Sequence, residues 1–251
     1  MRAALPAVDD ATKSALAPTG ALRAGISLSN FLLVTGETPG GDPVGVSPGM
    51  AAMLAELLGC DVQYITFPSP GEVADAAGQD GWDIGNIGAD PLRAEFIQFT
   101  DAYCEIESTC VVGAGSHIQS FADVDQPGIK IATKKRAAYT LWLERNLQNA
   151  QLVQYDSMDG SLAGFLDEGL DVLAGLRPKL SEIAADHQDV RVLTDKFAAV
   201  QQAIGTPTVR GGAGVAYLQK FVEAAKATGL VAALIEQHGV AGKLSVAGEA
   251  R

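Results

Sequence analysis

The stretch GNIGADPLRAEFIQFTDAY, residues 85–103, decides how we expect the chain to fold. It starts within an apolar run, Trp82 to Ile87, that predicts a buried strand. A short loop rich in turn-forming residues follows and carries one arginine, Arg93. Ligands of open α/β sheets bind beyond the carboxyl ends of the strands. A guanidinium such as that of Arg93 offers a planar set of donors that matches a carboxylate.

The residues before this stretch alternate between strand-like and helix-like patterns. Apolar residues at helical spacing from Met50 to Leu58 predict a helix that stops at Gly59. Strands are predicted at residues 22–28 and 61–67, with a second helix at residues 72–77. This order predicts a mostly parallel sheet with helices on its faces, preceded by a loose N-terminus.

The same alternation restarts after the stretch. Residues 107–113 form the predicted passage into a second unit, whose strands lie at residues 130–133, 152–155 and 172–176 and whose helices lie at residues 138–147 and 162–166. An extended run at residues 199–206 precedes two helical patterns that close the chain. The sequence therefore predicts two α/β units in series.

Bulk properties exclude several classes of function. The 251 residues carry a net charge of −12, which disfavours nucleic acid and anionic membrane surfaces as partners. No apolar run is long enough to span a bilayer, so we expect no membrane insertion. The first twenty residues do not have the pattern of a signal peptide. The three cysteines have no metal-ligand or redox spacing and are expected to be small buried hydrophobes.

The order of motifs resembles family 3 extracellular solute-binding proteins, the polar amino-acid-binding components of ABC transporters. The arginine is followed by a run that ends at Tyr103 and has the pattern hydrophobic-x-Phe-Thr-Asp-x-Tyr, starting at Ile97. LRAGIS and VGVSPGMAAMLAELLG resemble the first strand and helix of that family, and SFADVDQPGIKIAT resembles its entry into the second lobe. The resemblance covers roughly residues 22–240.

The resemblance implies a type II periplasmic-binding-protein fold, in which two α/β lobes are joined by two crossing hinge segments. Lobe 1 would comprise residues 1–110 and 205–251, and lobe 2 residues 111–204, with hinges at residues 111–114 and 203–206. It further implies a monomer that captures a small polar, carboxylate-bearing ligand in the interlobe cleft for an ABC permease. The family resemblance points to the periplasm, whereas Met1 as the native start would point to the cytoplasm.

In the first lobe, the resemblance assigns Arg93 to the ligand's α-carboxylate. Asn86 and Gly88 at the strand end and Ser29 and Asn30 after the first strand are further candidates, and Phe31 is a candidate for packing on the ligand. A glycine-rich turn and ordinary Ser-Asn turn chemistry explain the same residues without a ligand, and both interpretations stay open. The strand-end position favours a binding role for at least Arg93.

In the second lobe, Thr133, Lys134 and Arg177 are the candidates. The family's small polar pair is replaced by Arg136 and Ala137, and its ammonium-binding aspartate aligns near Leu176. A basic run is also typical of a solvated surface patch. We hypothesise that the ligand is an anion and not a plain zwitterion, because a buried ammonium without a partner is costly. Asp90 or Asp156 remains an alternative partner for an ammonium.

No catalytic motif accompanies these residues. None of the three histidines has metal-ligand spacing or a nearby nucleophile, and neither a P-loop nor G-x-S-x-G is present. We therefore expect binding without catalysis, cofactor or metal. Two alternatives stay open: a cyclohexadienyl-dehydratase-like lyase, for which Asp90, Asp101 and Glu107 are the nearby acids, and a sensing or ligand-buffering protein.

Overall fold

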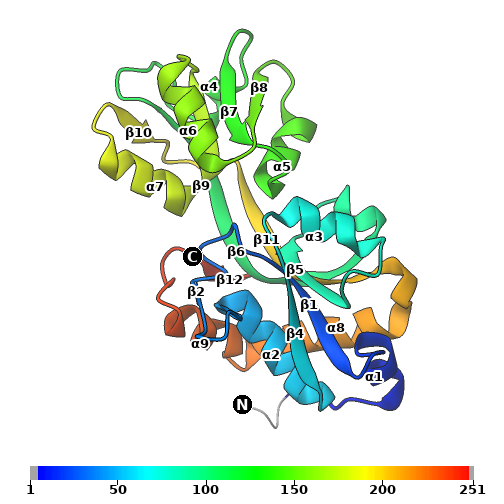
Figure 1. The fold of residues 1–251 in the computed structure, drawn as a ribbon. Coiled ribbons are helices and arrows are strands. Elements are labelled where there is room, and N and C mark those ends of the chain that lie inside the picture. The colour runs from blue at the N-terminus through cyan, green and yellow to red at the C-terminus, as the bar shows by residue number, and fades with distance from the viewer. Residues whose placement is uncertain (1–4, 249–251) are drawn as a thin grey trace. The chain divides into compact units, whose positions relative to one another are not determined.

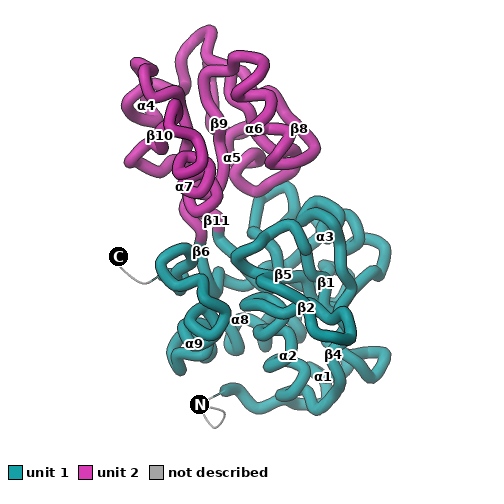
Figure 2. The backbone as a smooth tube through the Cα atoms, turned by 60° about the vertical axis from the view of Figure 1, so that its left-hand side comes forward, with its two compact units in different colours: residues 1–105, 201–251 teal, residues 106–200 magenta. Residues whose placement is uncertain are grey.

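The computed structural model describes residues 5–248, which divide into two compact units. Unit 1 comprises residues 1–105 and 201–251, and unit 2 comprises residues 106–200 (Figure 2). The chain crosses between them inside two long strands, β6 (Ile97–Gly113) and β11 (Ala198–Pro207). Both crossings lie a few residues earlier than the boundaries and hinges expected from the sequence. Residues 111–113 pair with a strand of unit 2 and residues 203–205 pair with a strand of unit 1, so each expected hinge is held inside a unit.

Unit 1 is built on a sheet whose first three strands are parallel, whereas β11 pairs antiparallel with the third (Figure 1). The strand order is β4-β1-β5-β11-β6, with β12 paired to β6, and the bounds are β1 (Ala21–Ser27), β4 (Asp61–Phe67), β5 (Ile84–Gly88) and β12 (Ser245–Val246). A separate two-stranded sheet is formed by β2 (Gly36–Glu37) and β3 (Pro43–Val44). The helices are α1 (Asp10–Leu16), α2 (Val46–Leu58), α3 (Pro70–Ala77), α8 (Gly212–Ala227) and α9 (Leu230–Gln237).

Two glycines let a tryptophan lie flat against the unit 1 sheet. A Cβ on Gly25 would lie 2.9 Å from Cδ1 of Trp82, and a Cβ on Gly85 would lie 3.0 Å from its six-membered ring. The indole is fully buried, and its Nε1 donates to the carbonyl of Val73 in α3 at 2.8 Å. This close contact fixes α3 on one face of β1 and β5, while α2 covers the other face.

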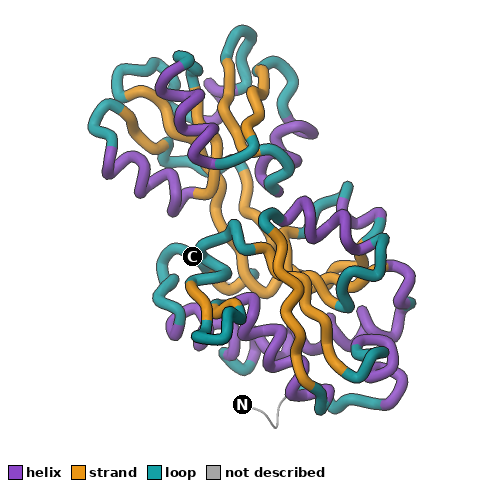
Figure 3. The backbone as a smooth tube through the Cα atoms, in the orientation of Figure 1, coloured by secondary structure: helices purple, strands orange, loops and turns teal. Residues whose placement is uncertain are grey.

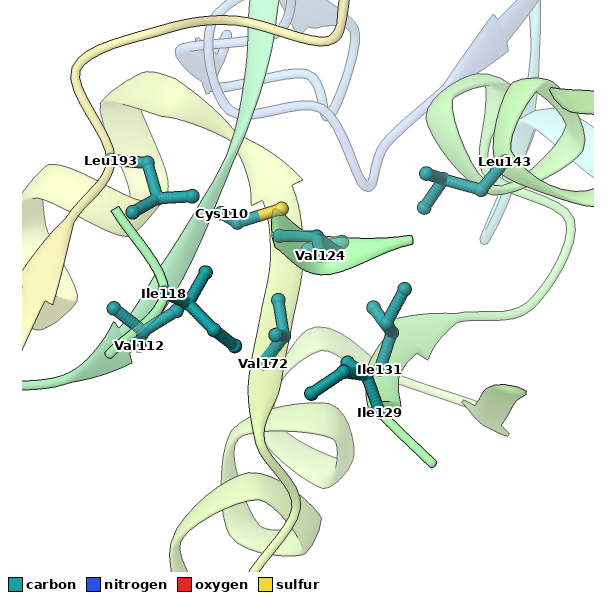
Figure 4. Packing of buried hydrophobic residues seen from close by; sticks show 10 residues of the cluster. Cys110, Val112, Ile118, Val124, Ile129, Ile131, Leu143, Val172 and Leu193 are labelled. Atoms are coloured by element: carbon teal, nitrogen blue, oxygen red, sulfur yellow. The ribbon is translucent and has the colours of Figure 1, made fainter. Parts of the chain in front are cut away.

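Unit 2 has the strand order β6-β9-β7-β8, with β10 paired to β6. Its strands are β7 (Lys130–Lys134), β8 (Gln151–Tyr155), β9 (Val172–Leu176) and β10 (Val190–Val192), and its helices are α4 (Phe121–Val124), α5 (Ala138–Asn146), α6 (Met158–Asp167) and α7 (Arg177–Asp186). Cys110 and Val112 of β6 point into one apolar core (Figure 4), whereas Val111 points into a second core on the opposite face. Trp142 packs against this first core in an aromatic cluster with Phe121 and Phe197, at centroid distances of 5.9 and 5.3 Å.

The N-terminal segment is ordered, against the expectation that it is loose. Asp9 caps α1 by accepting a hydrogen bond from the amide of Thr12 at 2.7 Å, and Leu16 is fully buried against α8. The helix is short and buries few residues, so its hydrophobic period is weak. Its only clear sequence signal is the capping aspartate.

A network of two arginines and two aspartates joins the start of β1 to the residues that follow β11. Asp83 is fully buried and accepts hydrogen bonds from Nε and Nη2 of Arg23, at 3.1 and 2.8 Å, and from Nη2 of Arg210 at 2.7 Å. Asp80 bonds both arginines as well, and its hydrogen bonds with Arg23 lower the pKa of Asp80. Arg210 lies in the short helix η3 (Thr208–Arg210), so the network anchors the end of β11 to unit 1.

Among residues 5–248, no helix combines the length and the apolar character needed to cross a membrane.

Candidate functional site

The carboxyl edge of the unit 1 sheet is the first candidate site. β1 and β5 are parallel neighbours, with Ile26 opposite Asn86, so both strands end at the same edge (Figure 3). Two loops leave that edge, residues 28–34 after β1 and residues 89–96 after β5. Five of the six candidates of the first lobe lie on these loops or at the strand end, namely Ser29, Asn30, Phe31, Gly88 and Arg93.

Arg93 lies in a short helix, η2 (Arg93–Glu95), within the second loop. Its Nη1 donates to the carbonyl of Gly88 at 2.6 Å, and the residue is 5% exposed. This bond ties the loop to the end of β5 and holds the guanidinium at the edge. A cation held in a partly desolvated place attracts a carboxylate more strongly than one in bulk water.

Ser29 and Asn30 have different environments. The hydroxyl of exposed Ser29 lies 3.3 Å from that of Ser27 at the end of β1. The side chain of Asn30 accepts a hydrogen bond from the amide of Leu32 at 3.2 Å, which is the local turn that the sequence also allowed. Asn30 therefore shapes the loop, while Ser29 presents its hydroxyl to solvent.

Asn86 does not lie at the edge surface. It is 2% exposed, and its Nδ2 contacts the carbonyl of Ser47 in α2 at 3.4 Å. Its Oδ1 has no hydrogen-bond partner among the described residues. The hydroxyls of Ser47 and Tyr103 hydrogen-bond at 2.7 Å, and burial raises the pKa of Tyr103. Alternation along β5 points Asn86 beneath α2, so it lies in the interior in this structure, and its contact with a ligand stays a prediction.

Exposed apolar side chains at this edge were not all foreseen. Leu28, Phe31 and Leu92 are 49%, 38% and 51% exposed. Only Phe31 was considered as a ligand contact from the sequence. A leucine between proline and arginine in a polar turn, as in DPLR, is the signal that could have identified Leu92.

The carboxyl edge of the unit 2 sheet is the second candidate site, formed by the ends of the parallel strands β7, β8 and β9. Thr133 is fully buried, and its hydroxyl is 2.7 Å from that of Thr140 in α5. The hydroxyl of Thr140 donates to the carbonyl of Lys134 at 2.6 Å. Thr133 is therefore an interior residue, in contrast to its predicted role, and Lys134 is the partly exposed candidate at this edge.

The other charges of this edge bond to one another. Nζ of Lys135 is 2.9 Å from the carboxylate of Asp156, in an exposed pair. Arg136 has a positive φ of 58°, a conformation that non-glycine residues rarely adopt. The positively charged run that the sequence shows is thus partly neutralised in the folded unit.

Arg177 serves as an anchor within unit 2. Its Nε donates to Glu107 at 2.8 Å, Nη1 donates to the carbonyl of Leu193 at 3.0 Å, and Nη2 donates to the carbonyls of Thr194 and Asp195 at 3.0 and 2.9 Å. Glu107 also pairs with Lys196 at 3.2 Å. These bonds occupy all three nitrogens of the guanidinium, so the geometry gives Arg177 a structural role in place of the predicted ligand contact.

The acids considered for catalysis also make structural bonds. Asp90 is 5% exposed and accepts from the amide of Leu92 at 2.9 Å, and Asp101 accepts from Nε2 of Gln219 at 2.8 Å. Glu107 is bonded to Arg177 and Lys196. Within residues 5–248, no group of three or more His, Cys, Asp or Glu side chains is arranged to hold a metal ion.

Solved structures share this fold at low sequence identity. A mutant of ArgBP from T. maritima matches with a TM-score of 0.69 and 15% identity, over 91% of this chain and 99% of that chain. A putative binding component of an ABC transporter from Wolinella succinogenes, complexed with lysine, matches with a TM-score of 0.71 and 18% identity, over 87% of this chain and 95% of that chain. The ancestral amino acid-binding protein AncCDT-1, a precursor of cyclohexadienyl dehydratase, matches with a TM-score of 0.70 and 18% identity, over 90% of this chain and 98% of that chain.

No family model matches the sequence, and no curated protein matches it. The structural likeness covers almost the whole of each solved chain. The protein therefore has the type II periplasmic-binding-protein fold, as the sequence predicted.

Proposed function

We propose that this protein is a solute-binding protein that captures a small carboxylate-bearing ligand, with Arg93 as its main contact. The observation that carries the proposal is the position of this guanidinium at the carboxyl edge of the unit 1 sheet, fixed to Gly88 by a 2.6 Å hydrogen bond. Ligands of open α/β sheets bind beyond such an edge. Solved proteins of the same fold are described in complex with lysine and as an arginine-binding protein, which supports a small carboxylate as the ligand.

Each unit contributes its own candidate contacts to this proposal. Ser29 and the strand end at Gly88 accompany Arg93 in unit 1, and Lys134 is the candidate of unit 2. Closure of such a protein upon binding shifts an equilibrium between conformations and needs no chemical step. We further propose delivery of the ligand to an ABC-type permease, since the lysine complex is described as a component of such a transporter.

The central test is the substitution Arg93→Ala. Removal of one member of a charge pair costs 2 kcal/mol or more, so the affinity for the ligand should fall by about thirtyfold or more. Isothermal titration of the wild type and the variant with a panel of amino and organic acids measures the change. Arg93→Lys keeps the positive charge but loses the planar set of donors of the guanidinium. Its loss of ligand affinity should be smaller than that of Arg93→Ala.

Arg191→Ala is the matched control. Arg191 also donates to backbone carbonyls, those of Ser116 and Ile118, but it lies on β10, opposite Val112 of β6, and Val112 pairs on its other side with the start of β9 and not its carboxyl end. Its substitution should leave the affinity unchanged. Equal losses in Arg93→Ala and Arg191→Ala would contradict the proposal. Conversion of a bound compound into a product, followed by mass spectrometry, would favour the lyase alternative; the amino acid-binding protein AncCDT-1 is described as a precursor of such an enzyme, cyclohexadienyl dehydratase.

A further inference from the structure

The two loops at the carboxyl edge of unit 1 display apolar side chains in an unusual way. Six large hydrophobic residues of the described chain are exposed, and four of them, Leu28, Phe31, Leu92 and Phe96, lie on these loops. Phe96 is the last residue of the second loop, next to β6, and the other two exposed residues, Leu166 and Val209, lie elsewhere. Clustered apolar groups on a soluble surface mark places where another apolar group binds.

The first loop holds its apolar residues outward by a specific turn. Leu32 and Leu33 are 1% and 3% exposed and belong to the core. The carbonyl of Asn30 accepts hydrogen bonds from the amides of Leu33 and Val34 at 3.0 and 2.9 Å, and its side chain accepts from the amide of Leu32. The turn therefore directs the following leucines into the core and leaves Phe31 at the edge.

The second loop has the same organisation. Arg93 and Ile97 are 5% and 1% exposed, whereas Leu92 between them and β5 is half exposed. The carboxylate of Asp90 accepts a hydrogen bond from the amide of Leu92. This bond fixes the backbone of Leu92, whose side chain extends into solvent. Both loops thus bury their neighbouring residues and present Leu28, Phe31 and Leu92, and folding alone does not require that arrangement.

The positive charge of Arg93 beside this apolar surface indicates which polar group the ligand carries. Arg93 follows Leu92 directly and adds a cation to a chain whose net charge is −12. The same loop carries two acids, Asp90, which is buried and bonded to the amide of Leu92, and Glu95, which is exposed. The guanidinium of Arg93 has N–H donors only, so it can bond a ligand's carboxylate and not a ligand's ammonium group.

We propose that the ligand is a monocarboxylate with an apolar aliphatic or aryl body, bound by Leu28, Phe31 and Leu92 with its carboxylate at Arg93. This inference rests on the proposed function and specifies the class of solute. It differs from the polar and cationic amino acids that the solved neighbours are described as binding. An α-ammonium group makes no contribution to this mode of binding.

The test compares pairs of ligands that differ by one amino group. Isothermal titration of the full chain uses 4-methylpentanoate against L-leucine and 3-phenylpropanoate against L-phenylalanine, with succinate and L-arginine as polar references. The apolar carboxylates should bind about tenfold tighter than their amino acids and than succinate. The substitutions Leu28→Ser, Phe31→Ser and Leu92→Ser should each weaken binding of the apolar carboxylates by roughly three- to tenfold.

Val209→Ser is the control variant, because Val209 is 82% exposed yet lies outside the two loops. Its affinities and melting temperature should match those of the wild type, and melting of all four variants checks that they fold. Tightest binding of a polar acid or an amino acid, unaffected by the three loop substitutions, would overturn this inference and leave the proposed function standing. Absence of binding by every carboxylate would overturn both.

Discussion

The two units of this protein build the same kind of α/β layer and use its carboxyl edge differently. In unit 1 the edge presents Leu28, Phe31 and Leu92 outward beside the guanidinium of Arg93. In unit 2 the charges at the edge bond among themselves, as in the Arg177–Glu107 pair. A ligand can therefore bind at the carboxyl end of a strand. The bonds that the side chains at that end make within the protein decide whether they are available to a ligand.

The largest effect expected from this comparison concerns the buried charges of unit 1. Asp83→Asn removes the carboxylate that both Arg23 and Arg210 contact, and it leaves two arginine charges without a buried counter-ion. We expect the free energy of unfolding to fall by about 3–5 kcal/mol, measured by urea denaturation. Asp80→Asn is the control, because the side chain of Asp80 is 69% exposed and its removal should cost much less. Equal falls in the free energy of unfolding for the two variants would show that burial does not determine how much each aspartate stabilises the protein.

A smaller effect distinguishes the arginines of the two edges. Arg177→Ala should lower the free energy of unfolding by about 2–3 kcal/mol, because it removes charge-assisted bonds to Glu107 and to three carbonyls. The affinity for a carboxylate ligand should stay within about twofold of the wild type, in contrast to Arg93→Ala. Calorimetric titration of the folded variant provides the check. Weaker binding without loss of stability would return Arg177 to the site.

The smallest effect is a pH dependence in unit 1. Burial lowers the pKa of His238, at the end of α9, below the value of 6.5 that it has when exposed. The unfolded state then binds the proton more tightly than the folded state, so this contribution to stability is complete above pH 6.5 and is lost as the pH falls through the folded pKa. The loss should be less than about 1 kcal/mol, because the residue is only partly buried. Urea denaturation at pH 8 and pH 5 should show a smaller difference in His238→Gln than in the wild type.

Much of the fold follows from local patterns. The strands at residues 61–67 and 172–176 were predicted at the bounds that β4 and β9 have, because alternating or wholly apolar runs bounded by turns are strong signals. The helix α7 was not predicted, because Arg177 and Pro178 follow the strand directly and leave no loop between the two elements. The strand β6 was predicted only in part, since nothing local marks the crossing inside a continuous strand of 17 residues.

The positions of the candidate residues in the fold were predicted in part, and their role in binding stays a prediction. Arg93 and Gly88 lie at a strand end because the chain order of strand, loop and arginine requires it. Asn86 and Thr133 lie inside because both faces of a parallel sheet are covered, so alternation alone cannot tell which polar residue reaches the surface. The partners of Arg177 include a glutamate 70 residues away in the sequence, and no local pattern encodes such a contact.

Each unit contains one of the two tryptophans, so tryptophan fluorescence can report on each unit. Trp82 is sealed beneath the glycines of unit 1, and Trp142 lies in the partly solvated aromatic cluster of unit 2. The chain contains no other tryptophan. Emission from Trp82 therefore reports an apolar, rigid environment, and emission from Trp142 reports a wetter one. Variants that keep a single indole allow the loss of structure in each half of the chain to be followed separately by fluorescence.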